Sequence, residues 1–65
     1  MSESVKLIVN AYVSLKDSQK IEELREHRQL LRAKLLACNG IDTSNSILLI
    51  DSDLSEIDAG LSRLQ

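Results

Sequence analysis

The sequence predicts an all-α protein built on a helical hairpin, and three observations carry that prediction. Proline is absent, glycine occurs at two positions and Tyr12 is the only aromatic residue, a composition that favours helix over sheet. A heptad pattern of apolar residues runs through the C-terminal third, and an Asn-Gly stop interrupts the middle of the chain. A length of 65 residues allows a single domain, residues 1–65.

The last segment gives the clearest pattern. Its apolar side chains recur at alternating spacings of three and four residues, as in the a/d seam of a coiled coil. Asp42, Thr43 and Ser44 precede it, and such side chains accept hydrogen bonds from free N–H groups at a helix start. We expect a helix over about 44–64, weakened by Gly60 by about 1 kcal/mol relative to alanine. The seam consists of Ile47, Ile50, Leu54, Ile57, Leu61 and Leu64.

The middle segment is also predicted to be helical, up to about residue 38. Gly40 suits a left-handed residue just beyond the helix end, and Ile41 would then pack back onto Leu36 in a Schellman motif. Residues 39–43 become a short connection between antiparallel helices. The apolar stripe of this segment consists of Ile21, Leu24, Leu31, Leu35 and Cys38, with Arg28 between Leu24 and Leu31.

Folding the chain at residues 41–42 places the two apolar stripes against each other. Residues 1–38 carry seven basic and five acidic side chains, whereas residues 39–65 carry one basic and five acidic. We therefore expect charge pairs along the seam, each worth about 0–1 kcal/mol where exposed. The expected apolar neighbours are Leu35 with Ile50, Leu31 with Leu54, and Leu24 with Leu61. The basic group that flanks the seam consists of Arg25, Arg28, Arg32 and Lys34, and the acidic group opposite it consists of Asp51, Asp53, Glu56 and Asp58.

The first segment, Val5 to Leu15, holds eight apolar residues in eleven positions. Its residues fit helical spacing, but they also alternate strictly, which is typical of a strand. We favour helix, because only residues 47–50 are available to pair with such a strand and they belong to the heptad pattern. The strand remains the alternative for residues 5–15.

The junction at residues 16–20 contains no glycine or proline. We favour an unbroken first helix over about 3–38, roughly 50 Å long. Residues 1–18 then project past the 19–65 hairpin as an association segment. The alternative is a break near 16–20, with Asp17 or Ser18 capping a new helix, and a three-helix bundle that hides the same side chains within one molecule.

The unbroken helix predicts association, because a long exposed apolar surface is costly in water. A second copy is the simplest cover, which gives a homodimeric helical bundle. The predicted self-association surface also includes the exposed edge of the apolar stripe over residues 21–38. Its principal residues are Val5, Ile8, Val9, Tyr12, Val13 and Leu15.

The sequence offers little for chemistry. One cysteine, Cys38, allows no internal disulfide, and with His27 it falls short of the four ligands of a structural zinc site. No H-E-x-x-H motif or glycine-rich phosphate loop is present. We expect no enzyme activity, no metal and no cofactor. Because the N-terminus lacks the pattern of a signal peptide, we expect a cytoplasmic protein.

A nucleic-acid-binding regulator is the alternative function, with Arg25, Arg28 and Arg32 as a basic ridge. The net charge is −2 and stacking aromatics are absent, so we expect these arginines to pair within the chain instead. Membrane binding is not expected either, because residues 5–15 lack a dense basic face.

The Leu30-Leu31…Leu35-Leu36 stripe, the Cys38-Asn39-Gly40 stop and the heptads from Ile47 to Leu64 together resemble the small helical-hairpin accessory proteins of bacteria and phages, including those of phage early regions. The resemblance implies a regulatory or host-interaction role exerted by docking onto another protein, and it assigns no functional residue. We therefore expect a non-enzymatic adaptor or regulator that acts through helix-mediated protein–protein association.

Overall fold

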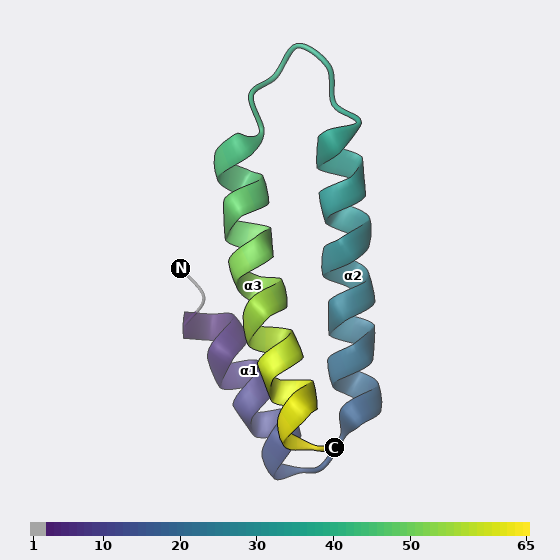
Figure 1. Cartoon of the computed structure of the whole chain (residues 1–65), viewed down its shortest axis with the longest axis vertical. Coiled ribbons are helices and arrows are strands. Elements are labelled where there is room, and N and C mark those ends of the chain that lie inside the picture. Colours follow the sequence, from purple (N-terminus) through teal and green to yellow (C-terminus); the bar gives the residue numbers. More distant parts are fainter. Residues whose placement is uncertain (1–2) are drawn as a thin grey trace.

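The computed structural model describes residues 3–65, which form three α-helices and no strand (Figure 1). Helix α1 spans Glu3–Ser14, α2 spans Ser18–Leu36 and α3 spans Ser44–Arg63. The prediction of an all-α chain is confirmed, and the strand alternative for residues 5–15 is wrong. Residues 1 and 2, part of the predicted 1–18 association segment, lie outside the described residues.

Helices α2 and α3 form the predicted antiparallel hairpin, joined by residues 37–43 (Figure 1). Helix α1 lies beside the C-terminal half of α3 and runs in the same direction as α3. The N-terminal half of α3 and the C-terminal half of α2 are accompanied only by each other. The molecule is therefore a bundle of three helices at one end and of two at the other, 42 Å long and 19 by 14 Å across.

The unbroken helix over about 3–38 is wrong, because the chain reverses at residues 15–17. The Asp17 N–H donates to the Tyr12 carbonyl at 2.9 Å and the Lys16 N–H to the Val13 carbonyl at 3.0 Å. These bonds form a Schellman motif whose left-handed residue is Lys16, with φ of +56°. This conformation costs an L-residue roughly 1–2 kcal/mol, so the turn is held by the docking of α1.

Helix α2 begins as soon as α1 has ended. Asp17 is its N-cap, and Oδ1 of Asp17 accepts a hydrogen bond from the Lys20 N–H at 3.2 Å. The break near 16–20, with Asp17 as the cap, is therefore the arrangement that the structure has. One short segment closes α1 and opens α2, which explains how a reversal occurs without glycine or proline.

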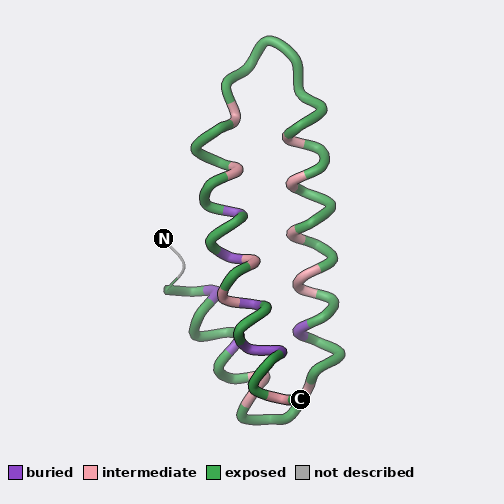
Figure 2. The backbone as a smooth tube through the Cα atoms, in the orientation of Figure 1, coloured by how far each residue is buried: buried purple, intermediate pink, exposed green. Residues whose placement is uncertain are grey.

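The core lies where all three helices meet, and most of the buried positions gather there (Figure 2). Gly60 makes this packing possible, since a β-carbon at that position would overlap Cγ1 of Val9. The absent side chain of Gly60 lets α1 approach the backbone of α3. The buried cluster consists of Val5, Val9, Ile21, Ile57 and Leu61, with Tyr12, Val13, Leu24 and Leu64 packed against it.

The loop between α2 and α3 departs from the prediction in detail. Helix α2 ends at Leu36, closed by hydrogen bonds from the Ala37 N–H to the Ala33 carbonyl and from the Cys38 N–H to the Leu35 carbonyl, both 3.2 Å. Gly40 has the expected left-handed φ, +78°, but it lies beyond these closing bonds. The Schellman motif predicted there is wrong, and Ile41 and Leu36 are both exposed.

Helix α3 begins at a cluster of polar residues, as predicted. Oδ1 of Asp42 accepts hydrogen bonds from the Ser44 N–H at 3.0 Å and from the Ser44 hydroxyl at 2.6 Å. These two hydrogen bonds lower the pKa of Asp42, and the bond from the hydroxyl has the larger effect. The carboxylate therefore stays charged at the start of α3, where negative charge is favourable.

Candidate protein-binding surface

The six predicted self-association residues divide between the core and the surface. Val5 and Val9 are only 3% and 1% exposed. Tyr12 and Val13 are half-buried against the same core. Ile8 and Leu15 remain on the surface, 42% and 73% exposed. Val5 and Val9 therefore cover the core of their own molecule and are not accessible to a partner while α1 stays docked.

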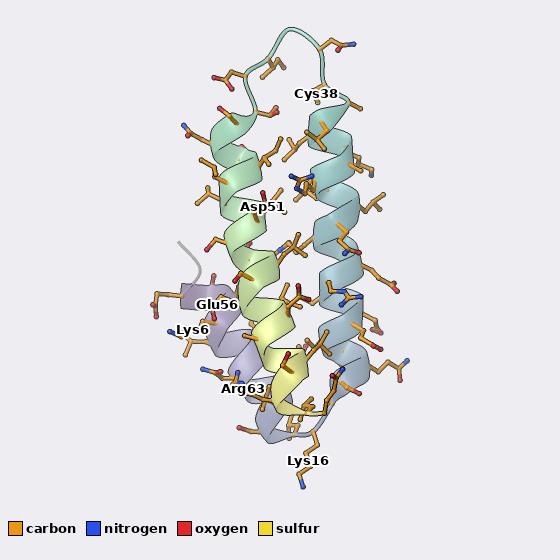
Figure 3. All side chains as sticks on the ribbon, viewed as in Figure 1. Lys6, Lys16, Cys38, Asp51, Glu56 and Arg63 are labelled. Carbon is orange, nitrogen blue, oxygen red and sulfur yellow. The ribbon has the colours of Figure 1, made fainter. Side chains whose placement is uncertain are left out.

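The three ridge arginines are each paired with an aspartate of α3. Arg32 Nε lies 2.7 Å from Asp51 Oδ1, and Arg25 Nη1 lies 3.4 Å from Asp58 Oδ1. The hydrogen bond with Asp51, and then its charge, raises the pKa of Arg32. Figure 3 shows Asp51 on α3. The prediction of charge pairing across the seam is confirmed for these two arginines, whose charges are balanced within the chain.

Arg28 makes a more buried ion pair. Its Nε lies 3.4 Å from Oδ2 of Asp53, and the two side chains are 23% and 6% exposed. This Nε forms no hydrogen bond, so the attraction is mainly between the two charges. Nη1 of Arg28 donates to Nδ1 of His27 at 3.1 Å. The predicted ridge thus faces α3 rather than presenting three free guanidinium groups.

An apolar surface lies at the two-helix end, and it includes part of the 21–38 stripe whose exposed edge is predicted to take part in association. On α3, Leu49, Asp53 and Gly60 share one stripe, since their spacings of four and seven residues return to the same side of a helix. Gly60 faces α1, so Leu49 lies on the same side of α3, three turns nearer its N-terminus. Leu49 is 43% exposed because α1 does not extend that far.

Helix α2 contributes to the same surface. Leu31 is seven residues after Leu24, which packs against the three-helix core, and both therefore lie on one stripe. Leu31 is 37% exposed. On the same half of the hairpin, Ile50 is buried and Leu35 is half-buried. We call Leu31, Leu35, Leu49 and Ile50 the open face.

The open face ends where the Arg28–Asp53 pair begins. Asp53 lies on its stripe between Leu49 and Gly60 and is 4% exposed. The Arg28–Asp53 pair therefore separates the apolar core that α1 covers from the apolar face that no described helix covers. Several other large apolar side chains are exposed on the molecule: Leu7, Leu30, Leu36, Ile41 and Leu48.

The remaining reactive residue is Cys38, a free and exposed cysteine near the C-terminal end of α2 (Figure 3). Its thiol donates to the Lys34 carbonyl at 3.4 Å. Within residues 3–65, no three side chains of the metal-binding types gather as a potential site. None of the helices described has both the length and the apolar character needed to span a bilayer.

Comparison with known proteins gives no relative: no family model, curated protein or solved structure matches this chain.

Proposed function

We propose that the protein is a small non-enzymatic adaptor or regulator that binds another protein through the open face. The observation that supports this is the incomplete bundle, in which α1 covers only one half of the hairpin. Leu31 and Leu49 flank the line of α1 beyond the Arg28–Asp53 pair and remain partly exposed. We also propose that the protein serves as a bacterial or phage accessory factor, as the sequence resemblance implies.

The partner that suits this face is a short amphipathic helix. The N-terminal half of α3 lacks a third helix beside it (Figure 1), a length of about 15 Å. A partner helix of roughly ten residues would continue the line of α1 and place apolar side chains at i, i+3 and i+7 against the open face. A second copy of the chain is the alternative occupant, which would give a homodimer that buries the open face in place of residues 5–15.

The open face supports modest affinity. Fully burying a leucine contributes about 1.5–3 kcal/mol, and Leu31 and Leu49 are less than half exposed. Each therefore adds about 1 kcal/mol when covered, and association itself costs several kcal/mol. Micromolar binding needs about −8 kcal/mol, so we expect affinity weaker than micromolar unless the partner also covers the neighbouring exposed leucines.

The test compares two surface variants of equal composition. The first variant carries Leu31→Glu and Leu49→Glu on the open face, and the control carries Leu30→Glu and Leu48→Glu on the same helices. Proteins captured from cells that produce the chain are compared by quantitative mass spectrometry. We expect a specific partner to be lost with the first variant and retained with the control.

Light scattering on the same proteins distinguishes the two occupants. A dimer of the unmodified chain that the first variant abolishes would assign the open face to a second copy. Equal capture by all three proteins, together with an unchanged mass, would refute the proposed surface.

A further inference from the structure

The segment between α1 and α2 has the properties of a hinge. Lys16 has a φ of +56°, and among the described residues it is the only non-glycine residue with a positive φ. Its side chain is exposed and points away from the helices (Figure 3), so no tertiary contact of the side chain holds this conformation. Residues 15–17 contain no glycine or proline. A straight helix through them would remove the left-handed residue and keep backbone hydrogen bonding complete.

The contacts that hold α1 are made chiefly with α3 rather than with α2, the neighbour in sequence. Val9 lies against Gly60 of α3. The Arg63 Nη2 donates to Asn10 Oδ1 at 2.8 Å. Val5 and Val9 pack in one cluster with Ile57 and Leu61. None of these contacts requires that α1 and α3 belong to the same chain.

The directions of the helices allow the exchange. Helix α1 runs parallel to α3 and antiparallel to α2 (Figure 1). If residues 15–17 straighten, α1 extends α2 beyond the end of the hairpin by about 18 Å. A second molecule placed end to end and inverted then presents its α3 parallel to this extended α1. A two-fold axis near the hinges relates both exchanges, so the arrangement closes as a dimer.

We propose that the chain forms a domain-swapped dimer, in which α1 of each copy docks on α3 of the other. Every buried contact of the monomer is kept, and the left-handed residue is relieved at both hinges. The dimer therefore becomes populated as concentration rises, and the hinge sets the concentration at which this occurs. This inference does not depend on the open face, which stays uncovered in both forms.

The test uses a disulfide that reports which chain supplies α1. A β-carbon at Gly60 would lie 3.7 Å from Cβ of Val9, within the range that a disulfide spans. The reporter protein is the full chain with Val9→Cys and Gly60→Cys, and with Cys38→Ser to remove the native thiol. Oxidation of the monomer links the chain to itself, whereas oxidation of the swapped dimer links two chains covalently.

Two hinge variants of the reporter are compared. Leu15→Ala, Lys16→Ala and Asp17→Ala together remove the left-handed turn and the cap, whereas Lys16→Gly makes the turn favourable. We expect the triple-alanine hinge to give covalent dimers on non-reducing gels and the glycine hinge to give monomers. Without the cysteines, Lys16→Gly should raise the dimer dissociation constant roughly 30-fold or more, because two left-handed residues are relieved per dimer.

Three results would overturn the proposal. One is a triple-alanine hinge that oxidises only within single chains. Another is a triple-alanine hinge that has lost its helical circular dichroism at every concentration up to millimolar, because exchange should restore the fold. The third is a non-covalent dimer whose disulfides are all intramolecular. This last outcome would place the dimer contact elsewhere, as on the open face, and so separates this inference from the proposed function.

Discussion

Gly60 is a position at which Val9 of α1 packs directly against α3, and its substitution tests the packing of the fold. A β-carbon there would overlap Cγ1 of Val9, which is almost fully buried and has little room to move. Gly60→Ala gains about 1 kcal/mol from helix propensity. Overpacking of this kind costs about 1–3 kcal/mol. We therefore expect Gly60→Ala to lower the free energy of unfolding by up to about 2 kcal/mol.

The same substitution should have the opposite sign once Val9 is shortened. Val9→Ala alone removes two buried methyl groups and should cost about 2 kcal/mol. In that background the new β-carbon meets only ordinary contacts, with Cβ of residue 9 at 3.7 Å and Cγ2 of Val13 at 3.5 Å. Gly60→Ala should then stabilise by about 1 kcal/mol. The coupling between the two positions is therefore expected to be about 1–3 kcal/mol.

Urea denaturation followed by circular dichroism measures all four proteins of this cycle. Ala59→Gly on the exposed neighbouring position is the control, and it should cost about 1 kcal/mol in both backgrounds. If Gly60→Ala stabilises the protein equally with valine and with alanine at position 9, α1 does not pack on Gly60 and the reasoning fails.

Three further predictions concern α1 and the two helix starts. Val9→Asp should undock α1 and abolish cooperative unfolding, whereas Ile8→Asp should change the melting temperature little. If the two variants melt alike, the difference in burial between Val9 and Ile8 is contradicted. Asp17→Ala should lower the free energy of unfolding by about 0.5–2 kcal/mol, and an unchanged urea midpoint would exclude its capping role. The lowered pKa of Asp42 means that its stabilisation is present above the ordinary value of 3.8 and is lost as pH falls through the folded value. Acid titrations should show that Ser44→Ala makes this shift smaller, because the hydroxyl bond is lost and the N–H bond of residue 44 remains; an unchanged Asp42 titration would contradict the hydroxyl bond.

The hairpin could be predicted because its signals are local and mutually consistent. The heptads from Ile47 to Leu64 predict a helix, the short connection at residues 39–43 predicts antiparallel pairing, and the opposite charges of the two segments support it. The ion pairs of Arg32 with Asp51 and of Arg25 with Asp58 lie on the expected neighbours. Even so, the predicted end of α2, at about residue 38, lies two residues beyond the observed end at Leu36. Gly40 does not close the helix as predicted, because loop geometry depends on contacts that periodicity does not encode.

The return of α1 onto α3 could not be predicted in the same way. A left-handed residue in a turn is usually glycine, but in this turn it is Lys16. The sequence around Lys16 therefore predicts a continuous helix. The informative residue was Gly60, which reads as a local weakness in α3 until the approach of Val9 is known. The role of Gly60 depends on a contact with another helix, which the sequence alone does not reveal. The α2 side of the open face belongs to the 21–38 stripe that the sequence predicts to associate. Its α3 side, Leu49, could not be predicted, because its exposure depends on where α1 ends.

The most direct test of the account is a nuclear Overhauser measurement on the dilute, monomeric protein. The structure predicts cross-peaks between the Val9 methyl protons and the Gly60 α-protons, and no helical cross-peaks that continue through residues 15–17. Continuous helical cross-peaks from residue 3 to residue 36, without any contact between Val9 and Gly60, would contradict it.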